Sequence, residues 1–153
     1  MAQFSTDSAA ASTGEGSPLP SLAACTALSI NQVRSLSPLA LAYVGDAVYE
    51  LHMRRCLLMP PKQLRAYPQQ VVDQVRAEQQ AYYLGCLKPH LTDEELDVVR
   101  RGRNAAANRK TRASLQDYQQ ATALEALIGY LYLTAPHRLN EVLAHLPFTP
   151  ELA

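Results

Sequence analysis

The chain has 153 residues, of which 48% are hydrophobic, so it is long enough for one domain with a substantial core. No apolar run approaches the roughly 20 residues that a helix needs to cross a membrane, and the N-terminus lacks the layout of a secretory signal. The 14 basic and 14 acidic residues cancel, so the total charge does not by itself favour a nucleic-acid partner. The three widely spaced cysteines argue against a disulfide framework or a zinc knuckle and indicate a reducing compartment.

The N-terminal part of the chain predicts a tail followed by a long helix. Residues 1–33 are mostly small and polar and hold no lasting apolar period, which is typical of a disordered tail. Ser37 and Pro38 are typical of a helix N-cap and a first helical position. We therefore expect a helix from this point to about Leu58, where a Pro-Pro pair stops it.

The remaining chain predicts further helices and no strand. The T-x-x-E pattern that begins at Thr92 is typical of a capping box, with Gly102 as the expected end of that helix. Residues 102–116 lack a stable apolar face and predict an exposed loop. The expected helices after the first one cover 61–67, Pro68 to between Gly85 and Pro89, 92–102, 114–133 and 139–147. We therefore expect an all-α fold, with a folded domain at 34–148 and a short tail at 149–153.

Two apolar helices each carry a carboxylate. Asp46 and Glu50 lie four residues apart in the apolar run 39–51, so they share one face of a helix. Glu125 is the only charged residue of the second apolar run, 121–133. A carboxylate in such surroundings is costly unless a cation or hydrogen-bond donors compensate it. A single such acid is more often a hydrogen-bonded structural residue, but two of them together favour an ion-binding site.

A basic cluster stands out against the neutral total charge. Residues 100–112 contain no acid, and their basic and amide side chains include Arg100, Arg101, Arg103, Asn104, Arg109, Lys110 and Arg112. Such a run forms either a solvated loop or an anion-binding surface. We favour an anion-binding surface, because acid-free runs of six cations are uncommon in a neutral protein. A resemblance of the surrounding stretches to a known family implies that the anion is double-stranded RNA, whose phosphates and 2′-hydroxyls suit a loop of arginine, lysine and asparagine.

Three stretches resemble the catalytic domain of ribonuclease III, in the correct order. They are Ala42-Tyr-Val-Gly-Asp-Ala-Val-Tyr-Glu50, Arg100-Arg-Gly-Arg-Asn-Ala105 and Leu124-Glu-Ala-Leu-Ile-Gly-Tyr-Leu-Tyr-Leu133. The resemblance covers about residues 36–146 and is strongest to the compact form, Mini-ribonuclease III. It implies an all-α, homodimeric endonuclease domain that uses Mg²⁺, with Mn²⁺ as a substitute, to cut both strands of double-stranded RNA.

The resemblance also implies roles for single residues. Asp46 and Glu125 match the family's metal-ligating and catalytic acids. Ala42 and Thr122 stand where full-length ribonuclease III usually carries two more acids, a departure that is similar to the Mini form and leaves the number of metal ions open. Thr122 lies one turn before Glu125 and is a candidate to hold a metal-bound water. Glu50 either accepts in the outer shell or pairs with an arginine at position i+4, and we favour the pairing.

Residues 126–153 are too few for an appended double-stranded RNA-binding domain, so we expect the catalytic dimer to bind RNA by itself. The resemblance implies the precursor of the large (23S) ribosomal RNA as substrate, a ribosomal protein as helper, no membrane partner, and a location in the bacterial cytoplasm or the plastid stroma. Two alternatives stay open. One is a non-catalytic RNA-binding scaffold or ribosome-assembly component of the same fold, and the other is a helical protein-interaction module.

Overall fold

The computed structural model describes residues 27–107 and 114–148. Its elements are α1 (Ile30–Ser35), α2 (Pro38–Cys56), the 3₁₀ turn η1 (Leu64–Ala66), α3 (Tyr67–Val75), α4 (Ala77–Leu87), the 3₁₀ turn η2 (Lys88–His90), α5 (Asp93–Ala105), α6 (Leu115–Thr134) and α7 (Pro136–Leu143). No strand occurs in these residues, so the predicted all-α fold is confirmed. None of the described helices is long and apolar enough to cross a membrane.

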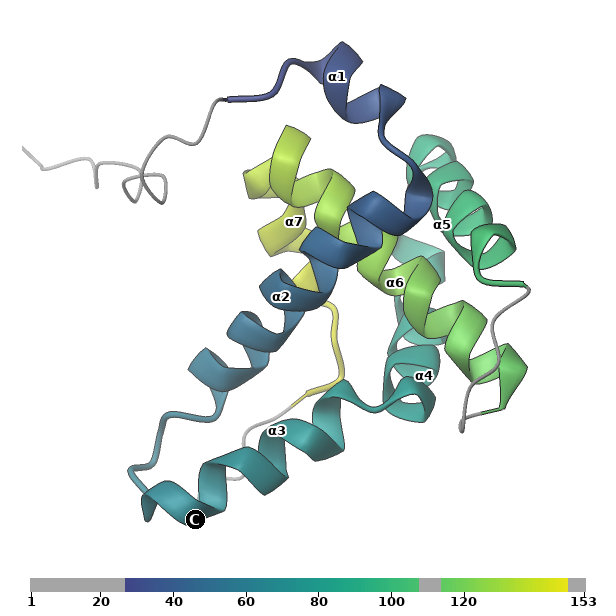
Figure 1. Cartoon of the computed structure of the whole chain (residues 1–153). Coiled ribbons are helices and arrows are strands. Elements are labelled where there is room, and N and C mark those ends of the chain that lie inside the picture. Colours follow the sequence, from purple (N-terminus) through teal and green to yellow (C-terminus); the bar gives the residue numbers. More distant parts are fainter. Residues whose placement is uncertain (1–26, 108–113, 149–153) are drawn as a thin grey trace, which may run out of the picture.

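Helix α6 forms the centre of the fold (Figure 1). Its sequence is apolar around most of its circumference, which is typical of a helix that is buried on several sides. Leu124, Leu127 and Ile128 are fully buried, and α6 packs against α1, α2, α4, α5 and α7. A charged residue on this helix is therefore held inside the molecule by the packing of its neighbours.

Helix α2 begins where the sequence predicted and ends close to the predicted position. The Ser37 side chain accepts a hydrogen bond from the backbone N–H of Ala40, and Pro38 is the first helical residue. The buried residues of this helix are Leu41, Ala42, Gly45, Tyr49 and Met53. Its opposite side is exposed, so α2 offers one face to the core and another to solvent.

The folded part of the chain starts earlier than the sequence predicted. Helix α1 begins within the range 1–33 that was expected to be a tail. Ser29 caps α1 by accepting a hydrogen bond from the backbone N–H of Gln32, whose side chain accepts one from Ser29 in return. Val33 then buries its side chain completely in the core. A helix of six residues with one capping box and one buried side chain shows too little apolar periodicity to be predicted from the sequence. Residues 1–26 of the predicted tail lie outside the described part of the chain.

The helix predicted after Pro68 consists of two helices. Helices α3 and α4 are separated at Arg76, whose backbone is extended with φ −62° and ψ 148°. The break lets α3 pack against α2 while α4 packs against α6, which a single straight helix does not allow. The short helix predicted at 61–67 is the 3₁₀ turn η1, and it runs directly into α3.

Helix α5 continues through Gly102, which was wrongly predicted to end it, and stops at Ala105. A Cβ atom at position 102 would lie 2.9 Å from the Cβ of Ala126. The glycine is therefore present because α5 and α6 approach closely there, and a helix tolerates it at a modest cost. The predicted loop 102–116 is helical as far as residue 105, and its residues 108–113 lie outside the described part.

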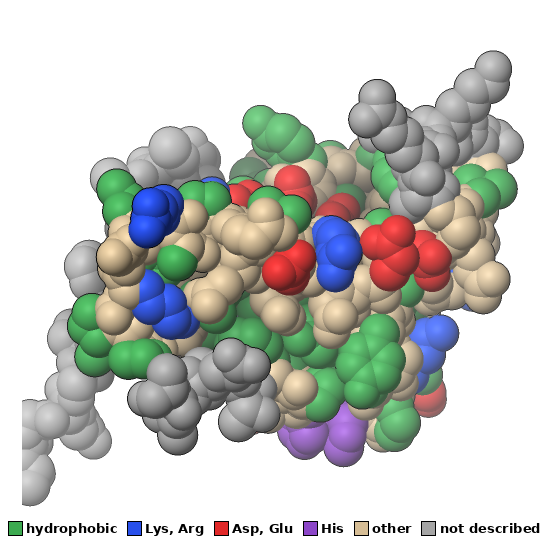
Figure 2. Space-filling view, turned by 90° about the horizontal axis from the view of Figure 1, so that it is seen from below, with side chains coloured by type: hydrophobic (Ala, Val, Ile, Leu, Met, Phe, Trp, Pro, Cys, Tyr) green, Lys and Arg blue, Asp and Glu red, His purple; other side chains and the backbone are tan. Residues whose placement is uncertain are grey.

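The surface reflects the balanced composition. On the face shown in Figure 2, basic and acidic side chains are interspersed, with exposed apolar side chains between them. This face therefore does not carry a field of one sign.

Candidate active site

Two glycines let helices α2 and α6 cross with their backbones in contact. A Cβ atom at Gly45 would lie 1.7 Å from the backbone oxygen of Glu125, and one at Gly129 would lie 2.0 Å from the backbone oxygen of Leu41. No side chain fits at either position, so only glycine permits this crossing. Asp46 directly follows Gly45, and the crossing therefore brings it near Glu125.

The carboxylates of Asp46 and Glu125 repel each other at this crossing. Burial, and then the charge of Asp46, raise the pKa of the half-buried Glu125 to about 7. Burial and the charge of Glu50 also raise the pKa of Asp46. Among the residues that the structure describes, none forms a hydrogen bond or an ion pair with Asp46. The site therefore carries uncompensated negative charge that a cation would offset.

Gln80 of α4 is a member of this site that no sequence pattern singled out. Its side chain is 2% exposed, and its Nε2 donates a hydrogen bond of 3.1 Å to Oε1 of Glu125. The same nitrogen donates one of 2.9 Å to the backbone oxygen of Val75. The available signal was its position three and four residues before the buried Tyr83 and Leu84, which places an amide on the core face of α4.

Glu50 pairs with Arg54, and Thr122 packs near α5. The Arg54 side chain donates to the Glu50 carboxylate through Nε at 3.0 Å and also through Nη2, which is the i, i+4 pairing that the sequence favoured. Thr122 is 4% exposed, and its backbone oxygen lies 3.4 Å from the Cβ position of Gly102. It therefore packs where α5 approaches α6, one turn before Glu125.

Two arginines of the basic cluster are partly neutralised. Asp97, which precedes them on α5, forms ion pairs with Arg100 and with Arg101, the second at 3.1 Å between Nε and Oδ2. The sequence window 100–112 contained no acid, but the turn before it supplies one. Helical spacing explains the pairing, because residues three and four apart are neighbours on a helix surface.

The remaining side chains of the basic cluster begin at the end of α5. Arg103 and Asn104 are exposed at the C-terminal end of α5. No residue in the described ranges forms an ion pair with Arg103. Arg109, Lys110 and Arg112 lie outside those ranges. The part of the predicted RNA-binding surface that the structure describes is therefore centred on Arg103.

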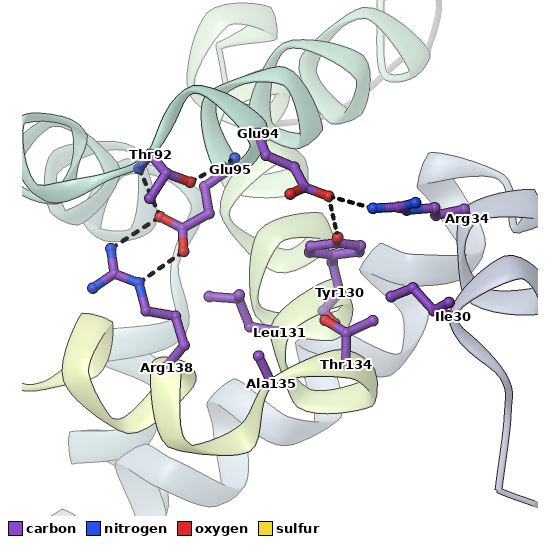
Figure 3. A pocket seen from close by; sticks show the side chains of 10 residues that line it. All are labelled: Ile30, Arg34, Thr92, Glu94, Glu95, Tyr130, Leu131, Thr134, Ala135 and Arg138. Carbon is purple, nitrogen blue, oxygen red and sulfur yellow. Dashed lines mark hydrogen bonds and ion pairs between the residues drawn. The ribbon is translucent and has the colours of Figure 1, made fainter.

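Neither Asp46 nor Glu125 lines the pocket of about 260 Å³ that is shown in Figure 3. It lies where α1, α5, α6 and α7 meet, and its charged side chains are paired. Arg34 binds Glu94 at 3.1 Å, and Arg138 binds Glu95 at 2.8 Å. The Tyr130 hydroxyl donates to Glu94 at 2.7 Å. These bonds connect α1 and α7 to α5, so we assign the pocket a structural role.

The carboxylate pair suits a divalent cation that keeps most of its water. In the described ranges no group of three or more His, Cys, Asp and Glu side chains gathers in a way that could hold a metal ion. Mg²⁺ needs only one or two carboxylates and retains several waters, so Asp46 and Glu125 suffice. In addition, Oε1 of Gln80 is buried without a hydrogen-bond partner, and a water of such an ion would satisfy it.

Known proteins are similar to this chain in sequence and in the arrangement of their helices. Residues 39–136 match the family model of the Ribonuclease III domain. The Mini-ribonuclease 3 of Synechocystis sp. is 56% identical over 112 residues, which cover 73% of this chain and 78% of that protein. The Mini-ribonuclease 3 of Synechococcus sp. is 52% identical over 122 residues, covering 80% and 88%. The crystal structure of protein FN1578 from Fusobacterium nucleatum superposes with a TM-score of 0.66 at 30% identity, over 72% of this chain and 92% of that one.

The matched region begins in α2, ends at the start of α7 and includes both carboxylates, so the fold is that of a ribonuclease III domain. The chain therefore belongs to the ribonuclease III family and, within it, to the Mini-ribonuclease III group. This membership confirms the resemblance seen in the sequence, and it makes the chain an endoribonuclease.

Proposed function

We propose that this chain is a Mg²⁺-dependent endoribonuclease that cuts double-stranded RNA and matures the precursor of the large (23S) ribosomal RNA. Asp46 and Glu125 would hold the Mg²⁺ ion, or Mn²⁺ in its place. The observation that carries the proposal is the contact of α2 with α6, which brings the half-buried Glu125 near Asp46, a second carboxylate that has no described partner. We place the reaction in the bacterial cytoplasm or the plastid stroma, with a ribosomal protein that shapes the RNA.

The residues of the site have distinct tasks in this reaction. Gly45 lets α2 and α6 touch, which sets the spacing of the two carboxylates. Glu125, with its pKa of about 7, gives up its proton near neutral pH when positive charge arrives. When bound, the divalent cation supplies activation of a water and stabilisation of charge on the scissile phosphate. Asp46 contributes its carboxylate from an exposed position of α2.

RNA contact is proposed for the C-terminal end of α5 and the residues that follow it. Arg103 and Asn104 are exposed there, and Arg109 and Lys110 continue the basic sequence. Arg100 and Arg101 contribute less to the attraction of phosphates, because Asp97 pairs with both. Such contacts recognise the shape and the backbone of double-stranded RNA rather than its bases.

A second copy of this chain is the proposed occupant of the exposed side of α2. Leu39, Tyr43, Ala47 and Leu51 follow one another at intervals of four residues and are all exposed, with Tyr43 at 83%. An aromatic side chain that projects so far from a helix is typical of a protein interface. Because Asp46 lies beside Ala47, pairing through this stripe would bring a second chain next to each site, which fits the cutting of both strands.

Substitution of Tyr43 by Lys tests this dimer. We expect the wild-type chain to sediment as a dimer at micromolar concentration and Tyr43→Lys to sediment as a monomer, because the substitution places a charge at the centre of the apolar stripe. Tyr82→Lys is the matched control, since Tyr82 is also an exposed tyrosine, at 58%, but belongs to α4. A wild type that is monomeric, or a Tyr43→Lys variant that remains dimeric, contradicts the proposed interface.

Cleavage of a long double-stranded RNA by wild type and by Asp46→Asn tests the function itself. In Mg²⁺ we expect the wild type to cut and the variant to lose at least about 1,000-fold in rate, because one of two carboxylate ligands is gone. EDTA is expected to stop the wild-type reaction. Circular dichroism checks that the variant is folded, which we expect because no described residue bonds to Asp46.

The alternative is a non-catalytic RNA-binding scaffold with the same fold. Ala42 and Thr122 are buried residues without a carboxyl group, so neither position adds an acid to the site. This alternative predicts RNA binding that weakens with salt and persists, without cleavage, whether or not metal is present. Folded wild type that binds double-stranded RNA in Mg²⁺ at low salt and leaves it intact would establish the scaffold.

A further inference from the structure

The side-chain amide of Gln80 has one defined orientation. Its Nε2 donates to two acceptors, Oε1 of Glu125 at 3.1 Å and the backbone oxygen of Val75 at 2.9 Å. The backbone oxygen of Val75 can only accept a hydrogen bond, so the amide nitrogen and not the amide oxygen must face it. Oε1 is consequently the free atom, and it is buried without a partner in the described part of the chain.

The break between α3 and α4 is the reason why Gln80 is available. Val75 is the last residue of α3, and Arg76 is extended, so the backbone oxygen of Val75 has left the helical hydrogen-bond pattern. Gln80 lies in the first turns of α4 and reaches back to this oxygen. The same side chain then meets α6 at Glu125. The amide of Gln80, near the start of α4, thus bonds both to the last residue of α3 and to Glu125, the more buried carboxylate of the site.

Packing alone does not explain an amide at this position. Gln80 is 2% exposed, and its two donated hydrogen bonds account for Nε2 but leave Oε1 as a buried acceptor without a partner. The free Oε1 shares its carbon with the nitrogen that bonds to Glu125, so it lies beside that carboxylate. A site that binds a hydrated cation there offers this oxygen a water as a donor.

We propose that Gln80 is a positioning residue of the cleavage site, whose amide nitrogen holds the Glu125 carboxylate in place and whose free amide oxygen accepts a hydrogen bond from a water of the hydrated cation. This inference rests on the proposed function, because it concerns the ion that Asp46 and Glu125 would bind. Residues that orient a metal ligand in this way typically change metal affinity or activity by roughly 10- to 100-fold when they are replaced.

The test is the substitution Gln80→Met in the full chain, with Gln74→Met as the matched control. Gln74 is a half-buried glutamine that accepts a hydrogen bond from the Tyr83 hydroxyl and does not contact Glu125. Mn²⁺ binding without RNA is measured by electron paramagnetic resonance, and RNA cleavage is titrated with Mg²⁺. For Gln80→Met we expect roughly 10- to 100-fold weaker Mn²⁺ binding and a similar increase in the Mg²⁺ needed for half-maximal cleavage. RNA affinity, measured without metal, stays close to wild type.

The outcomes separate this inference from the function on which it rests. Wild type that binds Mn²⁺ and cuts RNA, together with Gln80→Met at wild-type Mn²⁺ affinity, overturns the role of Gln80 and leaves the proposed function intact. An equal loss of affinity in Gln74→Met overturns it as well. Wild type that binds no Mn²⁺ overturns both. If Gln80→Met does not fold, Gln80→Asn decides, because its amide is one methylene too short for both acceptors and the same loss of Mn²⁺ affinity is expected.

Discussion

Glu125→Gln is expected to abolish cleavage and, without metal, to make the protein more stable at pH 8. Burial and the charge of Asp46 disfavour the ionised form of Glu125. A glutamine has no charge and still offers Oε1 as an acceptor to Nε2 of Gln80, so the hydrogen bond of 3.1 Å is preserved. The substitution therefore removes the electrostatic cost of the site together with the cation binding that we propose for it, so stability is gained where function is lost.

The sign of the pH dependence follows from the raised pKa of Glu125. In the folded protein the carboxyl keeps its proton up to a pH of about 7, whereas its ordinary pKa is 4.5. The stability that the protonated form provides is complete below pH 4.5 and is lost as the pH rises through about 7. At about 1.4 kcal/mol for each pKa unit, and with allowance for solvent at a half-buried group, the loss at pH 8 is about 1–3 kcal/mol.

Urea unfolding at pH 5 and pH 8 in EDTA measures this effect. We expect Glu125→Gln to exceed the wild type by about 1–3 kcal/mol at pH 8 and by much less at pH 5. Glu78→Gln is the control, because Glu78 is an exposed acid of α4, and it should show no such difference between the two pH values. A Glu125→Gln variant that is less stable than wild type at pH 8, or that cuts RNA, contradicts the assignment of Glu125.

Gly45→Ala is expected to destabilise the domain by more than about 4 kcal/mol or to prevent folding. The new Cβ would lie 1.7 Å from the backbone oxygen of Glu125 and 2.8 Å from the backbone nitrogen of Gly129. These are backbone atoms of the central helix and cannot rotate away, so α2 must separate from α6. The gain of about 1 kcal/mol in helix propensity is too small to offset that loss.

Gly85→Ala provides the control for Gly45→Ala within the same fold. Gly85 is also helical, but no heavy atom lies within 4 Å of its Cβ position, and the residue is exposed on α4. We expect this substitution to stabilise the protein by up to about 1 kcal/mol. Denaturation followed by circular dichroism compares the two variants. A Gly45→Ala variant within 1 kcal/mol of wild type would show that α2 and α6 do not need their backbone contact.

Local chemistry made several features predictable from the sequence. The caps at Ser37 and Thr92 were found because a capping side chain bonds to a backbone N–H only a few residues away. The carboxylates Asp46 and Glu125 were found because charge is exceptional inside an apolar helix. The family resemblance agreed with both findings. Their proposed role as metal ligands remains a prediction.

Other features depended on contacts between elements that are distant in the sequence. The approach of α5 to α6 decided that Gly102 is a packing residue and not a helix end. The break at Arg76 followed from the packing of α3 and α4 on different helices. The pairing of Asp97 with two arginines is local, but Asp97 precedes the basic run 100–112, which itself contains no acid.

The sequence by itself determined the helical class, the starts of α2, α5 and α6 and the acids at the proposed site, because each depends on side chains that are neighbours along the chain. Only the tertiary structure decided that Gln80 touches Glu125 and that two glycines bring α2 against α6. Those contacts join residues that are up to 88 positions apart, namely Leu41 and Gly129. They form because the apolar surface of α6 is buried by all its neighbours at once, which no local pattern encodes.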